Sequence, residues 1–312
     1  EKLSTNSVIS SDAGPGGVLR IMMIACEQLP PYGGMVQTAN MFLHLLSTAI
    51  QEKKSASTTK AIEISIYNAQ EFDYPLSSEE WDSYDGILLP GSHSSAYDDS
   101  QPWIPFLRQV ILKEIHYPRR KALGICFGHQ IMAHSFYPNG LATKCSAGPQ
   151  AGCRSMNTIS NLLLHYPEES NNRPDDKKYL LYYSHGDMVA KLPSCSVSLA
   201  STLNVDIVAA AFFSSSDDAI LFQKQQRNSS YKINSQESVL PYAITFQAHP
   251  EFFDGDGFQH HFHNCVIGMC QSGALSQEAS DKELKDSIVN KDLVWKDTVD
   301  IMVQVGSILN WF

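Results

Sequence analysis

The stretch 122–134 contains the residue types and spacing of a reactive cysteine. A short apolar run ends at Gly124, Cys126 follows, Gly128 comes two residues later, and a helix-like pattern then begins. In a tight strand-to-helix turn, a nucleophile projects over the end of the sheet, and the flanking glycines leave room around it. The N–H groups and positive dipole end of the helix favour the reactive thiolate. Taken alone, the motif also fits a buried structural cysteine between two glycines.

A cysteine nucleophile needs a base to take and return its proton, and the base needs an orienting group. His249 and Glu251 can supply both, because residues two apart in an extended segment point to the same side and Pro250 stiffens the link. They follow the apolar segment 242–247, so we expect them at the same edge of the sheet as Cys126. An isolated His-Pro-Glu would more often be an ordinary loop with a capping Glu.

The elements that must position these residues alternate between strands and helices in the first part of the chain. The predicted strands cover 21–26, 61–67, 84–89 and 121–125, and the predicted helices cover 35–50 and 102–115. This alternation predicts a doubly wound α/β sheet, in which sites lie outside the carboxyl ends of the strands. Cys126 and Gly91 both lie at such ends.

The second part of the chain has a different pattern. From about 140 to 215 it consists of short β-like pieces with turns, and the polar stretch 214–236 is predicted to contain a surface loop. Three further helices are predicted over 259–270, 276–290 and 294–309. Residues 1–18 are small, polar and rich in Gly and Pro, so we expect a disordered lead-in.

Composition limits the classes of partner. The net charge of −10 argues against nucleic acid or an anionic membrane as the main partner, and no apolar run is long enough to span a bilayer. The seven cysteines are odd in number and form no CxxC pair, which favours reduced thiols and a cytoplasmic location. His260 and His263 could share a face of a helix, but no cysteine stands at zinc spacing, so we expect neither a metal nor another cofactor.

Three motifs occur in chain order: Gly-Ile-Cys-Phe-Gly-His-Gln at 124–130, Ser-His-Gly-Asp at 184–187, and Thr-Phe-Gln-Ala-His-Pro-Glu at 245–251. Together they resemble the class I glutamine amidotransferases with a Cys-His-Glu triad, over about 19–270. The likeness is greatest to stand-alone members such as γ-glutamyl peptidases and fungal amidotransferase-like proteins. It implies a flavodoxin-like, mostly parallel sheet, an amidotransferase-like domain over 19–272 and a helical extension over 273–312.

The resemblance also implies roles for individual residues. The catalytic triad would be Cys126, His249 and Glu251, with attack on the γ-carbonyl of a glutamine-like group to give a γ-glutamyl thioester. The backbone N–H groups of Gly91 and Phe127 would form the oxyanion hole, since a tetrahedral oxyanion needs such donors. The residues implied in substrate binding are Gln130, Ser184, His185, Gly186 and Asp187.

Three functions remain open from the sequence. The first is a hydrolase or transferase acting on a small-molecule γ-glutamyl amide or peptide. No phosphate-binding P-loop and no Ser-Gly-Gly-x-Asp run occur, so we expect no ATP-using synthetase within these 312 residues. The second is a glutaminase subunit that supplies ammonia to a separate synthase chain. The third is a catalytically silent binding protein, against which the complete triad argues.

One departure from the family pattern is Tyr-Pro-Asn-Gly at 137–140, where Gly-Gly is frequent.

Overall fold

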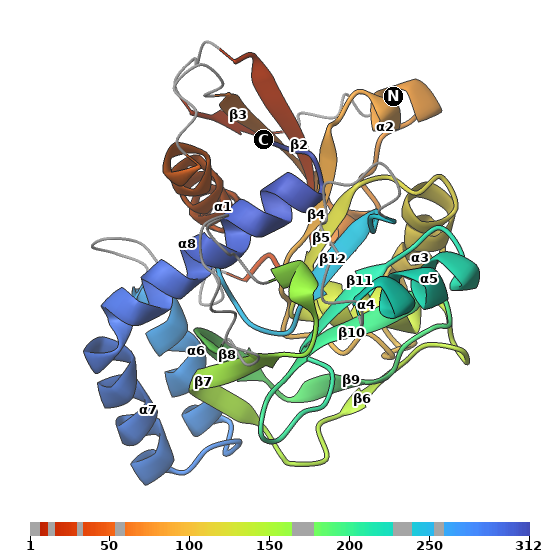
Figure 1. Ribbon diagram of the computed structural model, residues 1–312. Helices are drawn as coiled ribbons and strands as arrows, with labels where there is room; N and C mark the ends of the chain where they lie inside the picture. Colours follow the sequence, from red (N-terminus) through yellow and green to blue (C-terminus); the bar gives the residue numbers. More distant parts are fainter. Residues whose placement is uncertain are drawn as a thin grey trace.

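The computed structural model describes residues 7–11, 16–29, 34–53, 60–163, 178–226, 239–252 and 259–312. Within these residues, ten strands form one sheet in the order β1-β3-β2-β4-β5-β12-β11-β10-β7-β8, and β6 and β9 form a separate pair (Figure 1). The strands are β1 (Ser7–Ser10), β2 (Val18–Ala25), β3 (Ala61–Asn68), β4 (Gly86–Leu89), β5 (Ala122–Ile125), β6 (Leu141–Lys144), β7 (Gln150–Thr158), β8 (Lys178–His185), β9 (Asp187–Lys191), β10 (Ser196–Ser201), β11 (Ala209–Phe212) and β12 (Ala243–Phe246).

The α-helices of the described residues pack around this sheet, and none of them is long and apolar enough to cross a membrane. They are α1 (Gly34–Glu52), α2 (Ser78–Asp82), α3 (Trp103–Val110), α4 (Phe127–His134), α5 (Ser216–Gln226), α6 (Gln259–Gln271), α7 (Gln277–Val289) and α8 (Lys291–Ile308). A π-helical segment, Ile111–His116, continues α3, so together they fill the predicted helix over 102–115.

One half of the sheet is parallel. Strands β3, β2, β4, β5 and β12 run in the same direction, and each pairs in register with its neighbours. Continuous apolar runs form these strands because both faces of a parallel sheet are covered by helices. The four predicted strands of this half and the predicted strand before His249 are therefore confirmed.

Alternate residues of each parallel strand enter two different cores. In β2, Ile21 and Met23 face the core under α1 and α8, whereas Met22 and Ile24 face the core under α3 and α4. Side chains alternate between the two faces of a strand, so one apolar run supplies both layers. The result is a sheet between helical layers, which is the predicted doubly wound arrangement (Figure 1).

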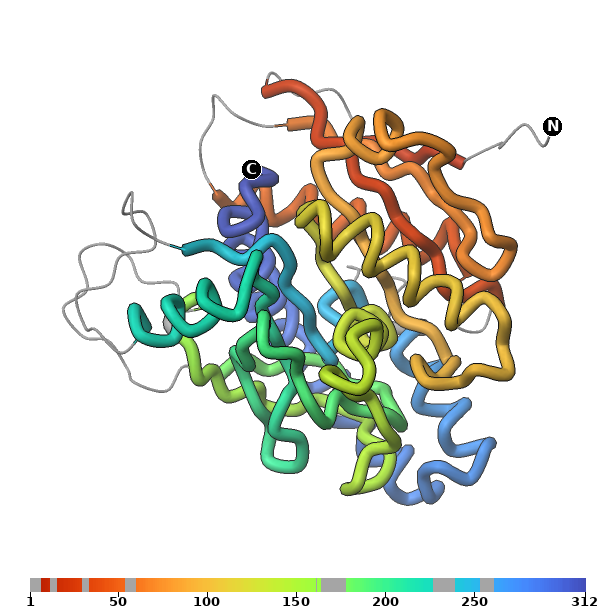
Figure 2. Tube along the Cα trace, turned by 90° about the vertical axis from the view of Figure 1, so that its right-hand side faces the viewer, coloured from red at the N-terminus to blue at the C-terminus, as the bar shows by residue number. Residues whose placement is uncertain are grey.

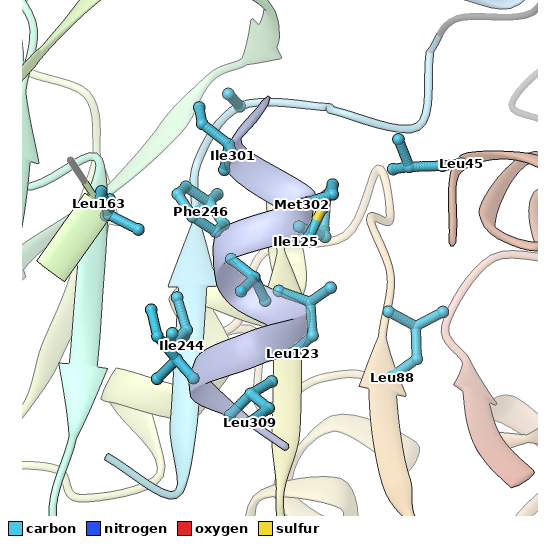
Figure 3. Close-up of a cluster of buried hydrophobic side chains, with 14 of the residues drawn as sticks. Leu45, Leu88, Leu123, Ile125, Leu163, Ile244, Phe246, Ile301, Met302 and Leu309 are labelled. Atoms are coloured by element: carbon cyan, nitrogen blue, oxygen red, sulfur yellow. The ribbon is translucent and has the colours of Figure 1, made fainter. Parts of the chain in front are cut away.

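The last helix lies directly on the parallel strands. Figure 3 shows α8 lying over β12 and β5, with Ile301 beside Phe246 of β12 and Met302 beside Ile125 of β5. After α8, the indole of Trp311 is fully buried against β4, where a Cβ on Gly86 would collide with its ring. The end of the chain thus forms part of the same hydrophobic core as the parallel strands.

The other half of the sheet is antiparallel, with β11, β10, β7 and β8 paired in that order. Helix α6 packs against β8, and α7 packs against β7. Both views place these two helices at the lower end of the molecule, away from β1 and β3 (Figures 1 and 2).

Three elements differ from the sequence expectations. Ser7–Ser10, within the expected disordered lead-in, form β1, an edge strand paired antiparallel with β3. Its exposure explains the miss, since only Ile9 packs against the core. Ser216–Gln226, within the expected surface loop, form α5, which buries only Ala219 and Phe222. The short helix α2 was not predicted. Residues 227–238 of the expected loop lie outside the described residues.

Candidate active site

Cys126 lies at the turn between β5 and α4, as the motif predicts. Its backbone has φ +52° and ψ −104°, a region that residues with a side chain rarely adopt. Such a conformation costs on the order of 1 to 3 kcal/mol and persists only when the surroundings enforce it. Two hydrogen bonds do so: the Cys126 N–H donates to Phe246 O (2.7 Å), and Gln130 N–H donates to Cys126 O (3.1 Å).

The two glycines of the motif are required by close backbone approach. A Cβ at Gly128 would overlap the carbonyl oxygen of Leu89 at the end of β4. A Cβ at Gly124 would lie 2.9 Å from both Gly128 O and the methyl group of Thr245. Real Cβ atoms are not found that close, so both positions are confined to glycine.

His249 lies between Cys126 and Glu251, all three being at least 95% buried. Its Nδ1 is 2.8 Å from Glu251 Oε1, its backbone N–H donates to Tyr182 O (2.8 Å), and its ring stacks on Phe252 with centroids 4.0 Å apart. These contacts fix the imidazole in position and in plane.

The charges around His249 favour its protonated form. Burial acts to lower its pKa, but the charges of Cys126 and Glu251, with hydrogen bonds to both side chains, outweigh burial and raise the pKa to about 10. An imidazolium held between a sulfur and a carboxylate places a positive charge beside the Cys126 sulfur, as a cysteine nucleophile requires.

The predicted oxyanion donors flank the cysteine. Phe127 is the first residue of α4, so its backbone N–H has no acceptor within the helix. Gly91 follows β4, and a Cβ on it would lie 3.0 Å from His249 Cε1 and 3.6 Å from Cys126 Cβ. The absence of a side chain at Gly91 therefore keeps the space beside the sulfur free for a reacting carbonyl group.

One pocket of about 320 Å³ contains the nucleophile. It brings together all the predicted site residues except Phe127, whose ring packs against Trp103 (centroids 5.6 Å apart) and whose backbone alone can face the pocket. The predicted residues that line it are Gly91, Cys126, Gln130, Ser184, His185, Gly186, Asp187, His249 and Glu251.

Asp187 contributes a carboxylate to the lining of this pocket. Its carboxylate accepts hydrogen bonds from Ser95 Oγ (2.6 Å) and Tyr97 OH (2.8 Å). Its backbone carbonyl accepts one from Gln130 Nε2 (3.0 Å) and lies 2.8 Å from His185 Nδ1. Burial lowers the pKa of His185 to about 4, so this imidazole stays neutral beside the pocket.

Part of the pocket lining is apolar and comes from α1, α6 and the loop after the triad. It contains the side chains of Met41, Phe252, Cys265 and Met269. Burial first, then the nearby charge of Cys126, raises the pKa of the Cys265 thiol to about 12, so Cys265 remains a neutral thiol. The sequence predicted α6 but gave no signal that it would border the site.

Several residues of the site were missed from the sequence. Ser95 and Tyr97 lie in a loop after β4, and nothing local marks them as partners of Asp187. Gln247 lies within the third motif, and its Nε2 is 3.6 Å from Cys126 Sγ. Its place two residues before His249 in an extended segment could have indicated that it faces the cysteine. Among the described residues, no group of three or more His, Cys, Asp or Glu side chains could hold a metal ion.

Comparison with known proteins finds similarity to the same family as the sequence motifs do. Residues 53–269 match the family model described as "Glutamine amidotransferase class-I". Gamma-glutamyl peptidase 3 of Arabidopsis thaliana is 30% identical over 178 residues, 50% of this chain and 64% of the relative. The GMP synthase [glutamine-hydrolyzing] of Solidesulfovibrio magneticus is 26% identical over 214 residues, 67% of this chain and 34% of that protein.

A solved structure supports the fold. The crystal structure of a glutamine amidotransferase from Thermotoga maritima has a TM-score of 0.59 and 13% identity to this chain, covering 93% of this chain and 98% of that one. The family model spans more than half of the 312 residues, including Cys126, His249 and Glu251. This chain belongs to the class I glutamine amidotransferase family.

Proposed function

We propose that this protein hydrolyses γ-glutamyl amide bonds through a γ-glutamyl thioester on Cys126. The observation that carries the proposal is the position of His249, buried between the Cys126 sulfur and the Glu251 carboxylate inside one pocket. A cysteine, a base and an orienting carboxylate in that order are the parts that nucleophilic acyl transfer requires.

In the first step the Cys126 thiolate attacks the γ-carbonyl carbon of the substrate. The C=O electrons move to oxygen, and the N–H groups of Phe127 and Gly91 stabilise the resulting oxyanion. The imidazolium of His249 then donates its proton to the departing nitrogen, so the C–N bond breaks and an amine leaves. Glu251 holds the His249 ring in orientation throughout.

In the second step water replaces the amine. Neutral His249 takes a proton from the water as its oxygen attacks the thioester carbon, and collapse of this second tetrahedral species breaks the C–S bond. Glutamate is released, and the Cys126 thiolate and the His249 imidazolium are restored. The cycle consumes one water molecule and needs no cofactor.

Asp187 is suited to hold the amino-acid end of the substrate. Its carboxylate, fixed by Ser95 and Tyr97, can form an ion pair with an α-ammonium group. We therefore propose that the pocket lining around Asp187 binds the glutamyl unit, as the family resemblance implies.

The leaving group must lie on the side of His249, because His249 protonates it. Met41, Phe252, Cys265 and Met269 form an apolar wall of the same pocket, and Phe252 stacks directly on the His249 ring. Ammonia would leave such a wall without contacts, whereas a substituted amine can pack against it. We therefore propose that γ-glutamyl peptides are better substrates than glutamine.

The test compares glutamate release from γ-glutamyl peptides and from glutamine by wild type, Cys126→Ala and Cys26→Ala. Cys26 is the matched control, since it is a fully buried thiol at the end of β2 and does not line the pocket. We expect Cys126→Ala to lose at least about 10³-fold in rate, because the nucleophile is removed, and Cys26→Ala to keep its activity.

The outcomes separate the functions that the sequence left open. Cys126-dependent release from glutamine alone would favour a glutaminase subunit that serves a separate synthase, for which the similarity to a GMP synthase is the supporting observation. Full glutamate release by Cys126→Ala would refute the thioester mechanism. Release from no substrate would leave two functions: a glutaminase subunit that is inactive without its synthase partner, and a silent binding protein, against which the intact triad argues. A search for a partner chain would then follow.

A further inference from the structure

We propose that Gln247 is a further catalytic residue, whose side-chain amide donates a hydrogen bond to the Cys126 sulfur and stabilises its thiolate. This rests on the proposed role of Cys126 as the nucleophile. Gln247 is fully buried, and its Nε2 lies 3.6 Å from Cys126 Sγ. Its backbone N–H donates to Val208 O (2.8 Å), which anchors the residue beside the turn between β5 and α4 that carries Cys126.

The orientation of the Gln247 side-chain amide can be deduced from the backbone carbonyl of Asp187, through the side chain of Gln130 that lies between them. The carbonyl oxygen of Asp187 can only accept a hydrogen bond, so the group 3.0 Å from it must be the NH₂ of Gln130. That same NH₂ lies 3.2 Å from Gln247, so the atom of Gln247 facing it must be the oxygen. The NH₂ of Gln247 is then left to face the sulfur.

This donor is chemically distinct from His249. The imidazolium gives up its proton to the leaving group and takes another from water, whereas an amide keeps its N–H through both steps. Gln247 therefore supports the thiolate even when His249 is neutral. Hydrogen bonds to charged acceptors are the stronger class, and burial away from water increases their effect.

A second group near the sulfur favours the protonated thiol instead of the thiolate. On another side, Cys126 Sγ lies 3.9 Å from the carbonyl oxygen of Ser184, which can accept only from a protonated thiol. Gln247 therefore favours the thiolate and the Ser184 carbonyl favours the thiol. Removal of the Gln247 donor should shift this balance toward the thiol.

The experiment measures the thiolate directly, without substrate turnover. The rate of alkylation of Cys126 by iodoacetamide is followed from pH 5 to 10 by mass spectrometry of the peptide that contains Cys126. The variants are Gln247→Met, which keeps length and burial but removes the donor, and Gln247→Glu, which places a carboxyl group beside the sulfur. Gln304→Met is the matched control, because Gln304 is a buried glutamine of α8 that bonds Tyr179 and not the site.

We expect Gln247→Met to raise the pH midpoint of alkylation by about one unit, which slows alkylation about ten-fold at any pH well below the wild-type midpoint. Gln247→Glu should shift it further, and Gln304→Met should match wild type. Gln130→Met, which frees the Gln247 amide to rotate, should give a smaller shift in the same direction. Urea unfolding of each variant identifies those that retain the fold.

Either result is decisive for Gln247. A folded Gln247→Met or Gln247→Glu protein with the wild-type alkylation profile would overturn the proposal. If the profile shifts while even wild type releases no glutamate, the donor role stands and the proposed function fails. If Gln247→Met does not fold, the comparison of Gln247→Glu with wild type carries the test.

Discussion

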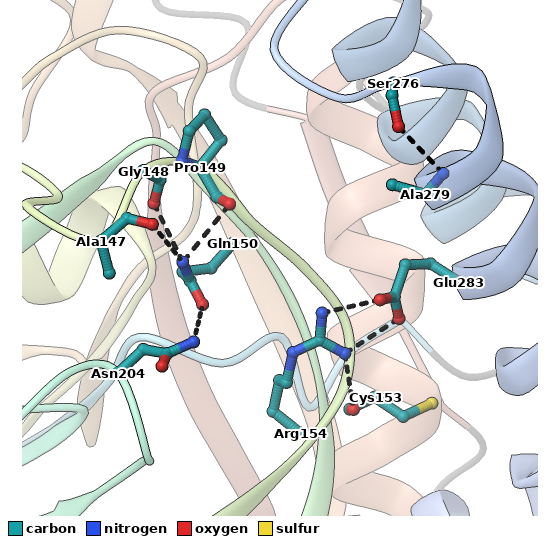
Figure 4. A network of polar contacts seen from close by, with 10 residues as sticks. All are labelled: Ala147, Gly148, Pro149, Gln150, Cys153, Arg154, Asn204, Ser276, Ala279 and Glu283. Atoms are coloured by element: carbon teal, nitrogen blue, oxygen red, sulfur yellow. Dashed lines mark hydrogen bonds and ion pairs between the residues drawn. The ribbon is translucent and has the colours of Figure 1, made fainter.

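The two halves of the sheet use glycine in different ways. In the parallel half, Gly128 lets α4 approach the backbone carbonyl of Leu89. In the antiparallel half, Gly152 has φ +103° and leaves room for the side chain of Glu283 from α7, which forms a two-point ion pair with Arg154 (Figure 4). One glycine is required by rigid backbone, the other by the end of a side chain that can move.

This difference matches what each half contributes. The parallel half holds the nucleophile and the base at strand ends, where sub-ångström placement decides the chemistry. The antiparallel half leads into Ser184–Asp187 and packs against α6, which borders the pocket, and against α7, which does not. We therefore expect changes at the strand ends around the nucleophile and base to abolish activity, and changes in the antiparallel half outside Ser184–Asp187 to reduce stability more than chemistry.

The largest effect is expected for Gly128→Ala. The added methyl group must displace either α4 or the end of β4, since the atom it meets is backbone. We expect a loss of about 3 kcal/mol in the free energy of unfolding and at least about 10²-fold in glutamate release. Urea denaturation and the glutamate assay measure the two.

The control for that substitution is Gly17→Ala, also in the parallel half. Gly17 has φ +87° but open space around it, so alanine there meets only backbone strain, about 1 kcal/mol. Its activity should stay near wild type. Equal losses in the free energy of unfolding of the two variants would mean that the contact with Leu89 is not what requires glycine at position 128.

The comparison also explains which features could be predicted from the sequence. The parallel strands were predicted because burial on both faces gives continuous apolar runs. The turn that carries Cys126 was predicted because Gly-x-Cys-x-Gly is a strong local pattern. The placement of Ser184–Asp187 in the pocket, with the triad, followed from the family resemblance. The contacts of Ser95 and Tyr97 with Asp187 join segments about 90 residues apart, and no local pattern encodes such pairing.

Marginal elements were missed for a related reason. Helix α5 has a polar sequence with two buried residues, and β1 is an exposed edge strand of four residues. Both are stabilised by neighbours rather than by their own periodicity. The part of the pocket lining that α6 contributes depends on how α6 packs against β8, and this packing is set by tertiary contacts rather than by local sequence.

The next effect in size is the pH dependence of stability at the triad. The pKa of His249 is raised to about 10 in the folded protein from about 6.5 when unfolded. A raised pKa contributes stability that is fully present below about pH 6.5 and is lost as pH rises through about 10. We expect the free energy of unfolding to fall over this window by on the order of 1 to 3 kcal/mol.

The variant Glu251→Gln sharpens this prediction. It removes one of the charges that raise the pKa of His249, so the decline should be smaller and should end at a lower pH. Urea unfolding of both proteins from pH 6 to 10 measures the difference. Arg154→Met, in the antiparallel half, should keep the wild-type pH dependence. If it loses that dependence instead, the effect does not arise at the triad.

The smallest effect is expected for Gly152→Ala. Its methyl group would meet the Glu283 carboxylate, which can turn aside at the cost of its bond to Arg154. Arg154 is 34% exposed, so water replaces part of the lost interaction. With the strain of a positive φ, we expect a loss of about 1 to 2 kcal/mol in the free energy of unfolding and nearly unchanged glutamate release.

A double-mutant cycle with Glu283→Ala isolates the contact. In that background the new methyl group meets only the Arg154 guanidinium, which has lost its Glu283 partner and can turn aside, so Gly152→Ala should cost little more than the backbone strain, about 1 kcal/mol. The coupling between the two substitutions therefore measures how much of the glycine requirement comes from Glu283. If Gly152→Ala costs as much as Gly128→Ala and abolishes activity, the antiparallel half is as rigid as the parallel half, and the contrast between their glycines fails.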